Sequence, residues 1–294
     1  MHPLTPLFAV LASLGILFAD TEAWAAPAVA GASVEAVQSP AWRDRGGITV
    51  PLVAGMELQS GDVLRTGSGA RAYLMLAEGS RVKLGEGARF TFHSRSTQPD
   101  KTFRGALDVL AGAFRFTTGK LKKALPRDVA IRVGTATIGI RGTDLWGKTD
   151  RDGDLVALLE GRIEITRAGQ TTELSQPLTY YDAPNGKAAE VKTLDPEVFR
   201  KLTRQTEILA GDGAARAKGK WSVLAGSAAS EEAALELYDK LRDAGFATRV
   251  KPRGVEGGGW SYDLLISGFA SAADAEAAAS RIKAATGLKP SVQR

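Results

Sequence analysis

The sequence of 294 residues contains no cysteine and only two histidines, His2 and His93. Without thiols the chain can form no disulfide, carry no cysteine-linked lipid and build no Cys–His nucleophile pair. So few histidines also exclude a His-rich zinc site. Any Ser–His arrangement would have to use His93, which ends the alternating run Phe90–His93 out of phase with its phenylalanines and is predicted at the surface. We expect no metal and no cofactor.

Long apolar runs are also absent, with one exception near the amino terminus. Leu7–Ala19 is almost wholly apolar, too short to span a bilayer and of the length found in secretion signals. The small-residue motif Ala23–Ala25 follows it. We therefore predict a signal peptide over residues 1–25, cleavage before Ala26 and a periplasmic mature protein without a stable membrane span. An uncleaved anchor is the alternative.

The overall charge is mildly basic, with a net charge of +5. Charged residues make up 24% and hydrophobic residues 44%, as in ordinary globular proteins rather than disordered ones. The basic residues are scattered, which is typical of a solvated surface, so we predict no nucleic-acid partner. A mildly basic protein is also compatible with attraction to anionic groups of the cell wall or of lipids.

Short β-rich runs separated by Gly, Asp and Ser turns fill residues 34–184. Turns recur about every ten residues, which predicts an all-β roll, sandwich or barrel. A stack of short rungs, as in a β-solenoid, would give the same pattern. The clearest predicted strands are Asp62–Thr66, Ala70–Leu76, Arg81–Leu84, Arg89–Phe92, Ala113–Thr117, Val129–Val133, Leu155–Leu159 and Arg162–Thr166.

Two ordered motifs in this part carry a family resemblance. Gly61–Leu84 resembles the opening of the FecR domain, and Thr135–Asp144, with Arg141-Gly-Thr, resembles its later segment. The resemblance implies an extracytoplasmic β domain over residues 26–194 for protein or wall contact. Well-known members are membrane-spanning regulators that signal to a sigma factor. The cytoplasmic segment and internal membrane helix of those regulators are not evident here, so we do not expect the signalling role.

The glycines around Arg141 admit two interpretations. Glycines permit turn angles that other residues avoid, so Gly142 is expected in a turn that an Arg141–Asp144 pair stabilises. Alternatively, Arg141 binds a carboxylate through its two-pronged guanidinium. No helix follows these glycines, so they are not a nucleotide-binding motif.

Residues 195–219 are predicted to be a helix and a flexible linker. Asp195 with Pro196 is a strong helix start. Phe199 and Leu202 give the helix an apolar edge, which we expect to pack on the β domain. Gly211–Gly219 is rich in glycine and alanine, which is typical of a flexible linker.

Residues 220–294 contain one half-unit written twice: an apolar strand, a Gly/Ser turn, an Ala-rich helix and a terminating glycine. With a strand after each helix, the order is βαββαβ, an α+β sandwich with both helices on one face of the sheet. The strands are predicted at Trp221–Ser227, Ala247–Lys251 and Tyr262–Phe269, the helix N-caps are Ser230 and Ser271, and the glycines are Gly245 and Gly287.

The two strands Trp221–Ser227 and Tyr262–Phe269, each followed by its helix, resemble the SPOR domain, the sporulation-related repeat of bacterial envelope proteins. The resemblance implies binding to peptidoglycan glycan strands that lack stem peptides, often where cells divide. The family commonly has Gln or Arg in the middle of these strands, where this chain has Leu224 and Leu265.

Strand alternation separates two faces of this predicted sheet. The set with Val223, Leu264 and Ile266 is the more apolar and should contact the helices. Leu224 and Leu265 should then lie side by side on the helix-free face, unless the strand phase is off by one and both are core. The candidate binding residues on the helix-free face are Ser222, Leu224, Arg249, Lys251, Asp263, Leu265 and Ser267.

These patterns favour a non-catalytic periplasmic envelope protein that binds peptidoglycan through its SPOR-like domain. The alternative is a scaffold protein whose SPOR-like fold binds no sugar. An enzyme acting on glycans would need a pair of carboxylates, and none sits in a recognisable motif. We predict no enzymatic activity.

Overall fold

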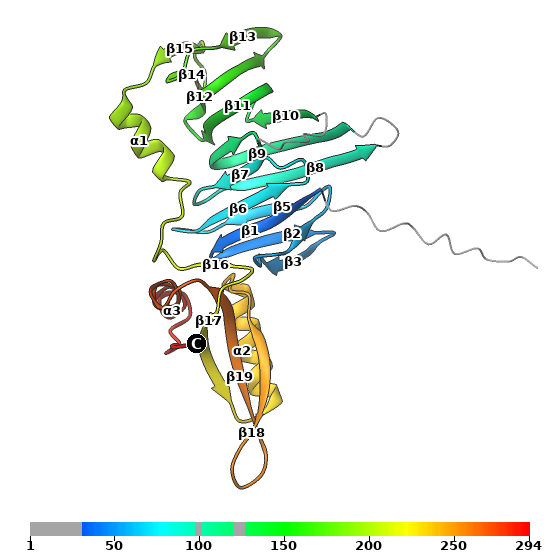
Figure 1. Ribbon diagram of the computed structural model, residues 1–294, viewed down its shortest axis with the longest axis vertical. Coiled ribbons are helices and arrows are strands. Elements are labelled where there is room, and N and C mark those ends of the chain that lie inside the picture. The colour runs from blue at the N-terminus through cyan, green and yellow to red at the C-terminus, as the bar shows by residue number, and fades with distance from the viewer. Residues whose placement is uncertain (1–30, 98–101, 120–126) are drawn as a thin grey trace, which may run out of the picture.

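The computed structural model describes residues 31–97, 102–119 and 127–294, and it shows a β-rich part joined to a smaller part with two helices (Figure 1). The predicted signal peptide and its cleavage site lie outside these residues. In the β-rich part the strands are β1 (Ala32–Gln38), β2 (Ala41–Arg45), β3 (Ile48–Pro51), β4 (Glu57–Leu58), β5 (Val63–Thr66), β6 (Arg71–Leu76), β7 (Arg81–Leu84), β8 (Arg89–Thr97), β9 (Thr102–Thr117), β10 (Arg127–Val133), β11 (Ala136–Asp150), β12 (Gly153–Arg167), β13 (Gln170–Leu174), β14 (Thr179–Pro184) and β15 (Glu190–Thr193).

These strands form two layers around one apolar core. The first layer runs β15-β14-β12-β11-β9-β7-β6-β1, and the second runs β13-β12-β11-β10-β9-β8-β5-β2-β3. The long strands β9, β11 and β12 belong to both layers. Neighbours among the described strands are antiparallel except β9 and β10. The all-β prediction is confirmed, and antiparallel pairing identifies a two-layer roll rather than a solenoid of parallel rungs.

Glycines mark the points where the long strands pass from one layer to the other. Gly112 in β9, Gly142 in β11 and Gly161 in β12 all have positive φ, of 83°, 64° and 86°. A Cβ on Gly161 would lie 2.2 Å from the carbonyl oxygen of Gly142, so no larger residue fits there. The predicted strands Leu155–Leu159 and Arg162–Thr166 are therefore two halves of one bent strand.

The segment around Arg141 was expected to form a turn. It instead lies within strand β11, where the register with β12 is irregular. The Asp144 carboxylate accepts hydrogen bonds from Arg115 at 3.0 and 2.8 Å and from the Thr117 hydroxyl at 3.2 Å. Both partners come from β9, so Asp144 joins adjacent strands of the first layer. The side chain of Arg141 lies outside the described part of the structure.

The helix α1 (Pro196–Arg204) begins as predicted. The Asp195 carboxylate accepts from the backbone N–H groups of Glu197 at 2.8 Å and Val198 at 3.3 Å, and Pro196 occupies the first turn. However, α1 buries none of its residues. Phe199 and Leu202 on its apolar edge are half-buried.

The prediction of a flexible linker after α1 is wrong. Gly211 and Gly213 donate their backbone N–H groups to Asp274, and β16 (Ala214–Arg216) pairs with β1 and contacts β19. A Cβ on Gly213 would lie 2.9 Å from the backbone nitrogen of Ala278. The small residues of this segment allow the two parts to pack closely together. They do not make the segment a flexible linker.

An acidic side chain holds the same connecting segment against the first layer. Glu207 accepts hydrogen bonds from Lys83 at 2.7 and 2.8 Å, from Arg115 at 3.0 Å and from the Tyr73 hydroxyl at 3.0 Å. The Tyr73 oxygen in turn accepts from the backbone nitrogen of Ile208 at 2.6 Å. Burial raises the pKa of Tyr73 to about 12, so the phenol stays protonated.

We expect Glu207→Gln to lower stability by about 1–2 kcal/mol at neutral pH, because it removes the charge that pairs with Lys83 and Arg115. Burial alone would raise the pKa of Glu207, but Lys83, Tyr73 and Arg115 hold it below its ordinary 4.5. This stabilisation is complete above the ordinary pKa and disappears as pH falls through the lowered one. Thermal melting of both proteins at neutral and acidic pH measures it.

The exposed Glu236→Gln in the second part is the matched control and should melt like the parent. Equal melting temperatures for the parent and Glu207→Gln at neutral pH would contradict this role of Glu207.

The second part has the predicted βαββαβ order, with the sheet order β18-β19-β17-β20 and every pair antiparallel. Ser230 and Ser271 cap the helices, as predicted. Its core is separate from that of the roll. The elements are β17 (Trp221–Ala228), α2 (Glu231–Asp243), β18 (Arg249–Gly254), β19 (Trp260–Phe269), α3 (Ala272–Thr286) and β20 (Ser291–Gln293).

Candidate functional site

One face of the second sheet is not covered by helices. The residues that strand alternation predicted for this face do lie on it. Val223 and Leu264 are fully buried beneath the helices, whereas Leu224 and Leu265 are only half-buried. Leu224 and Leu265 are also direct partners across the β17–β19 pair. The alternative that both leucines belong to the core is therefore wrong.

A bulge changes the phase at one end of β17. The register shifts between Leu224 and Gly226, and a Cβ on Gly226 would lie 3.7 Å from Leu237 of α2. Gly226 thus faces the helices, although simple alternation places it beside Leu224. The two leucines remain the apolar centre of the helix-free face.

The other candidate residues lie in rows around this centre. The Ser222 and Ser267 hydroxyls are 2.9 Å apart on one side of the leucines. Arg249 is the β18 partner of Leu265 and extends the apolar row to the sheet edge. Lys251 is the partner of Asp263 on the other side. All seven predicted residues therefore share one continuous face.

Asp263 is satisfied within this face. It accepts a hydrogen bond from Ser227 at 2.7 Å and from Arg253 at 3.1 Å. Ser227, followed by Arg253, holds the pKa of the Asp263 carboxyl below its usual range. Asp263 is therefore ionised at neutral pH and neutralised locally, which leaves the basic edge of the sheet with excess positive charge.

That basic edge is longer than the sequence predicted. The second strand was expected to end at Lys251, before Pro252, but β18 continues to Gly254. Arg253 therefore joins Arg249 and Lys251 on the same face by strand alternation. Among the described residues, neither Arg249 nor Lys251 forms a salt bridge. The period-two repetition of basic residues was the signal that could have found Arg253.

The chemistry of this face suits a neutral-to-acidic polyhydroxylated ligand. The leucine pair offers an apolar platform of the kind that marks a contact surface when apolar side chains cluster. The serines offer hydroxyl donors and acceptors, and the β18 edge offers cations for anionic groups.

The one described histidine lies in β8 and is not part of this face. His93 lies at the surface, as predicted, with 42% of its side chain exposed and its Nε2 3.3 Å from Asp108. Within residues 31–97, 102–119 and 127–294 there is no group of three or more potential metal ligands. In the same ranges, no helix has the length and apolar character needed to cross a membrane.

Two family models match separate parts of the sequence. The model described as FecR protein matches residues 62–164, and the SPOR domain model matches residues 217–294. The chain thus combines a FecR domain with a carboxyl-terminal SPOR domain. Both are non-catalytic domain families and suggest an envelope-associated protein, and the SPOR domain suggests peptidoglycan binding.

Similar solved structures include two crystal structures of a candidate anti-sigma factor from Parabacteroides distasonis, at 1.65 and 2.50 Å resolution. The first is 14% identical with a TM-score of 0.37 and covers 66% of this chain and 95% of that chain. The second is 13% identical with a TM-score of 0.39 and covers 76% and 91%. The comparison with curated proteins gives no match.

Proposed function

We propose that this chain is a non-catalytic periplasmic protein that binds peptidoglycan glycan strands lacking stem peptides. The observation that carries the proposal is the paired Leu224 and Leu265 on the uncovered face of a SPOR domain. The apolar face of a sugar ring packs on the leucines, and the Ser222–Ser267 pair exchanges hydrogen bonds with sugar hydroxyls.

The basic edge explains a preference for strands without peptides. Removing a stem peptide leaves a free carboxylate on each muramyl sugar. Arg249 and Lys251 have no salt-bridge partner among the described residues and can pair with such carboxylates. A strand that still carries its peptides offers fewer of these carboxylates.

The FecR domain contributes contacts with an envelope protein or with the wall. Binding of the SPOR domain to peptide-free strands recruits the protein to division sites, where such strands accumulate. The second candidate function is a scaffold whose SPOR domain contacts a protein. The specific observation behind it is the same leucine pair, which replaces polar residues common in the family and would also seat an apolar protein surface.

Co-sedimentation with isolated sacculi tests the proposal. Residues 26–294 should pellet with sacculi, and more strongly after amidase treatment has removed stem peptides. A protein that stays in the supernatant with both preparations would contradict glycan binding and favour the scaffold.

Export is a separate prediction from the apolar segment and the Ala23–Ala25 motif. Amino-terminal sequencing of the protein from a periplasmic fraction should begin at Ala26. A protein that begins at Met1 and fractionates with the inner membrane would instead support the uncleaved anchor.

A further inference from the structure

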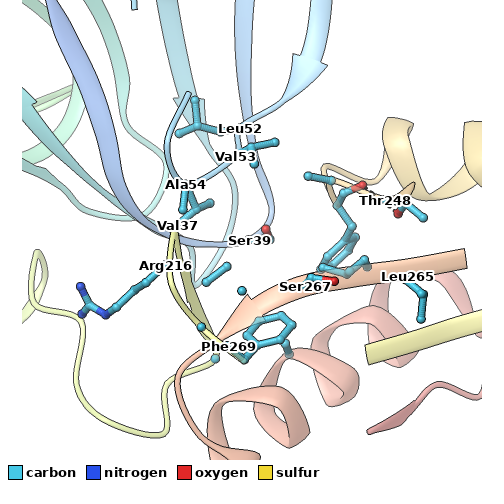
Figure 2. A pocket seen from close by; sticks show the side chains of 18 of the residues that line it. Val37, Ser39, Leu52, Val53, Ala54, Arg216, Thr248, Leu265, Ser267 and Phe269 are labelled. Carbon is cyan, nitrogen blue, oxygen red and sulfur yellow. Dashed lines mark hydrogen bonds between the residues drawn. The ribbon is translucent and has the colours of Figure 1, made fainter. Parts of the chain in front are cut away.

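The FecR and SPOR domains enclose a pocket where they meet, with a cavity volume of about 320 Å³. Figure 2 shows Val37, Ser39 and Leu52–Ala54 of the roll on one side and Thr248, Ser267 and Phe269 of the SPOR domain near the other. Ligand sites occur preferentially at such domain junctions, and this volume lies at the small end of the roughly 300–1,000 Å³ that they span. We call this cavity the junction pocket.

Most of the wall of the junction pocket is apolar. Val37, Leu52, Phe246, Phe269 and Ile282 line it, and each is at most 2% exposed. They belong to three different parts of the chain: the roll, the α2–β18 segment and the β19–α3 segment. These buried side chains form the closed floor of the pocket, and the more exposed Val53 and Leu265 offer the apolar surface that a ligand can cover.

The charged side chains that line the junction pocket are all positive. Its lining includes Arg249 and Arg281 and no Asp or Glu. Arg216 also borders it, but its side chain points away (Figure 2). The pocket is therefore complementary to an apolar molecule that carries a negative charge.

Arg281 is the cation that most needs such a partner. Its guanidinium is half-buried and donates to the carbonyl oxygen of Gly69 at 3.1 Å, and no described carboxylate lies within salt-bridge distance. Burial, with the nearby charge of Arg71, lowers the pKa of Arg281, and Asp212 offsets this only in part. A bound carboxylate would supply the missing counter-charge.

We propose that the junction pocket binds a small monocarboxylate with a medium-length apolar chain. The carboxylate pairs with Arg281, and the chain packs on Val53 of the roll and Leu265 of the SPOR domain. The ligand bridges both domains and stabilises their junction, because its contacts come from each of them.

The pocket also opens onto the proposed glycan-binding face, since Arg249, Leu265 and Ser267 belong to both. If the proposed function holds, an occupant should weaken sacculus binding by occupying one end of that face. This consequence rests on the proposed function, whereas ligand binding to the pocket does not.

Isothermal titration calorimetry of residues 26–294 with decanoate tests the pocket directly. Decanoate should bind, while acetate (the charge without the chain) and decyltrimethylammonium (the chain with the opposite charge) should not. Arg281→Gln should weaken binding at least about tenfold through the lost charged hydrogen bond. Ala54→Trp, which fills the pocket from the roll, should abolish it.

Leu235→Gln, at an exposed position of α2 outside the pocket, is the control and should bind decanoate like the parent. Circular dichroism checks that each variant is folded, and Ala54→Trp alone decides the test if Arg281→Gln is not. No heat with decanoate, equal binding of decyltrimethylammonium, or undiminished binding by folded Ala54→Trp would each overturn the proposal. Because calorimetry needs no sacculi, its failure is distinguishable from failure of the proposed function.

Discussion

Leu224→Glu should reduce binding to amidase-treated sacculi at least about tenfold while leaving the protein folded. Leu224 lies half-buried on the helix-free face opposite Leu265, so a carboxylate there remains in contact with water. The substitution removes apolar contact worth about 1.5–3 kcal/mol when fully covered, and tenfold in affinity corresponds to about 1.4 kcal/mol. The new charge also repels the free carboxylates of peptide-free strands.

The matched control is Leu235→Glu, the same change at a position that is 54% exposed on α2. It should sediment with sacculi like the parent. Equal loss of binding in both variants would show that added negative charge alone weakens attraction to the wall. Unchanged binding by folded Leu224→Glu would place the glycan site elsewhere.

Gly161→Ala should destabilise the roll by about 3–5 kcal/mol, a large fraction of the stability of an ordinary domain. Gly161 has a φ of 86°, and its added Cβ would lie 2.2 Å from the carbonyl oxygen of Gly142. Both the backbone conformation and the close approach of the two strands oppose a side chain. Chemical denaturation measures the loss.

Gly169→Ala separates these two contributions. Gly169 has a similar φ of 78° but nothing lies within 4 Å of its added Cβ. It should therefore lose only the conformational part, about 1 kcal/mol. Equal losses at both positions would contradict the role assigned to the close approach of Gly161 to Gly142.

The SPOR domain was predictable from the sequence because its periodicities agree with one another. Each strand has one buried face, so a register shift by one residue would expose Val223 or Leu264 and bury Leu224. That constraint correctly placed Leu224, Leu265 and the five other candidate residues on the helix-free face. Only the ends of the strands were missed, where the bulge at Gly226 and the continuation of β18 past Pro252 depart from simple alternation.

The topology of the roll could not be predicted in the same way. Alternation identifies strands but not their partners, and the pairing of β9 with both layers depends on contacts far apart in the sequence. From the sequence alone, a glycine in a turn cannot be told from a glycine at a bend within a strand. Gly161 was therefore expected to separate two strands, and Gly211–Gly219 to form a flexible linker, whereas both glycine-rich stretches serve close packing.

The most direct test of the central claim is to map a glycan onto the helix-free face by amide chemical shifts. Residues 26–294 are titrated with a soluble peptidoglycan oligosaccharide that lacks stem peptides, and with the same sugar carrying them. We expect shifts concentrated at Ser222, Leu224, Leu265 and Lys251 with the peptide-free sugar and much weaker shifts with the other. Shifts confined to α2 and α3, or none with either sugar, would contradict it.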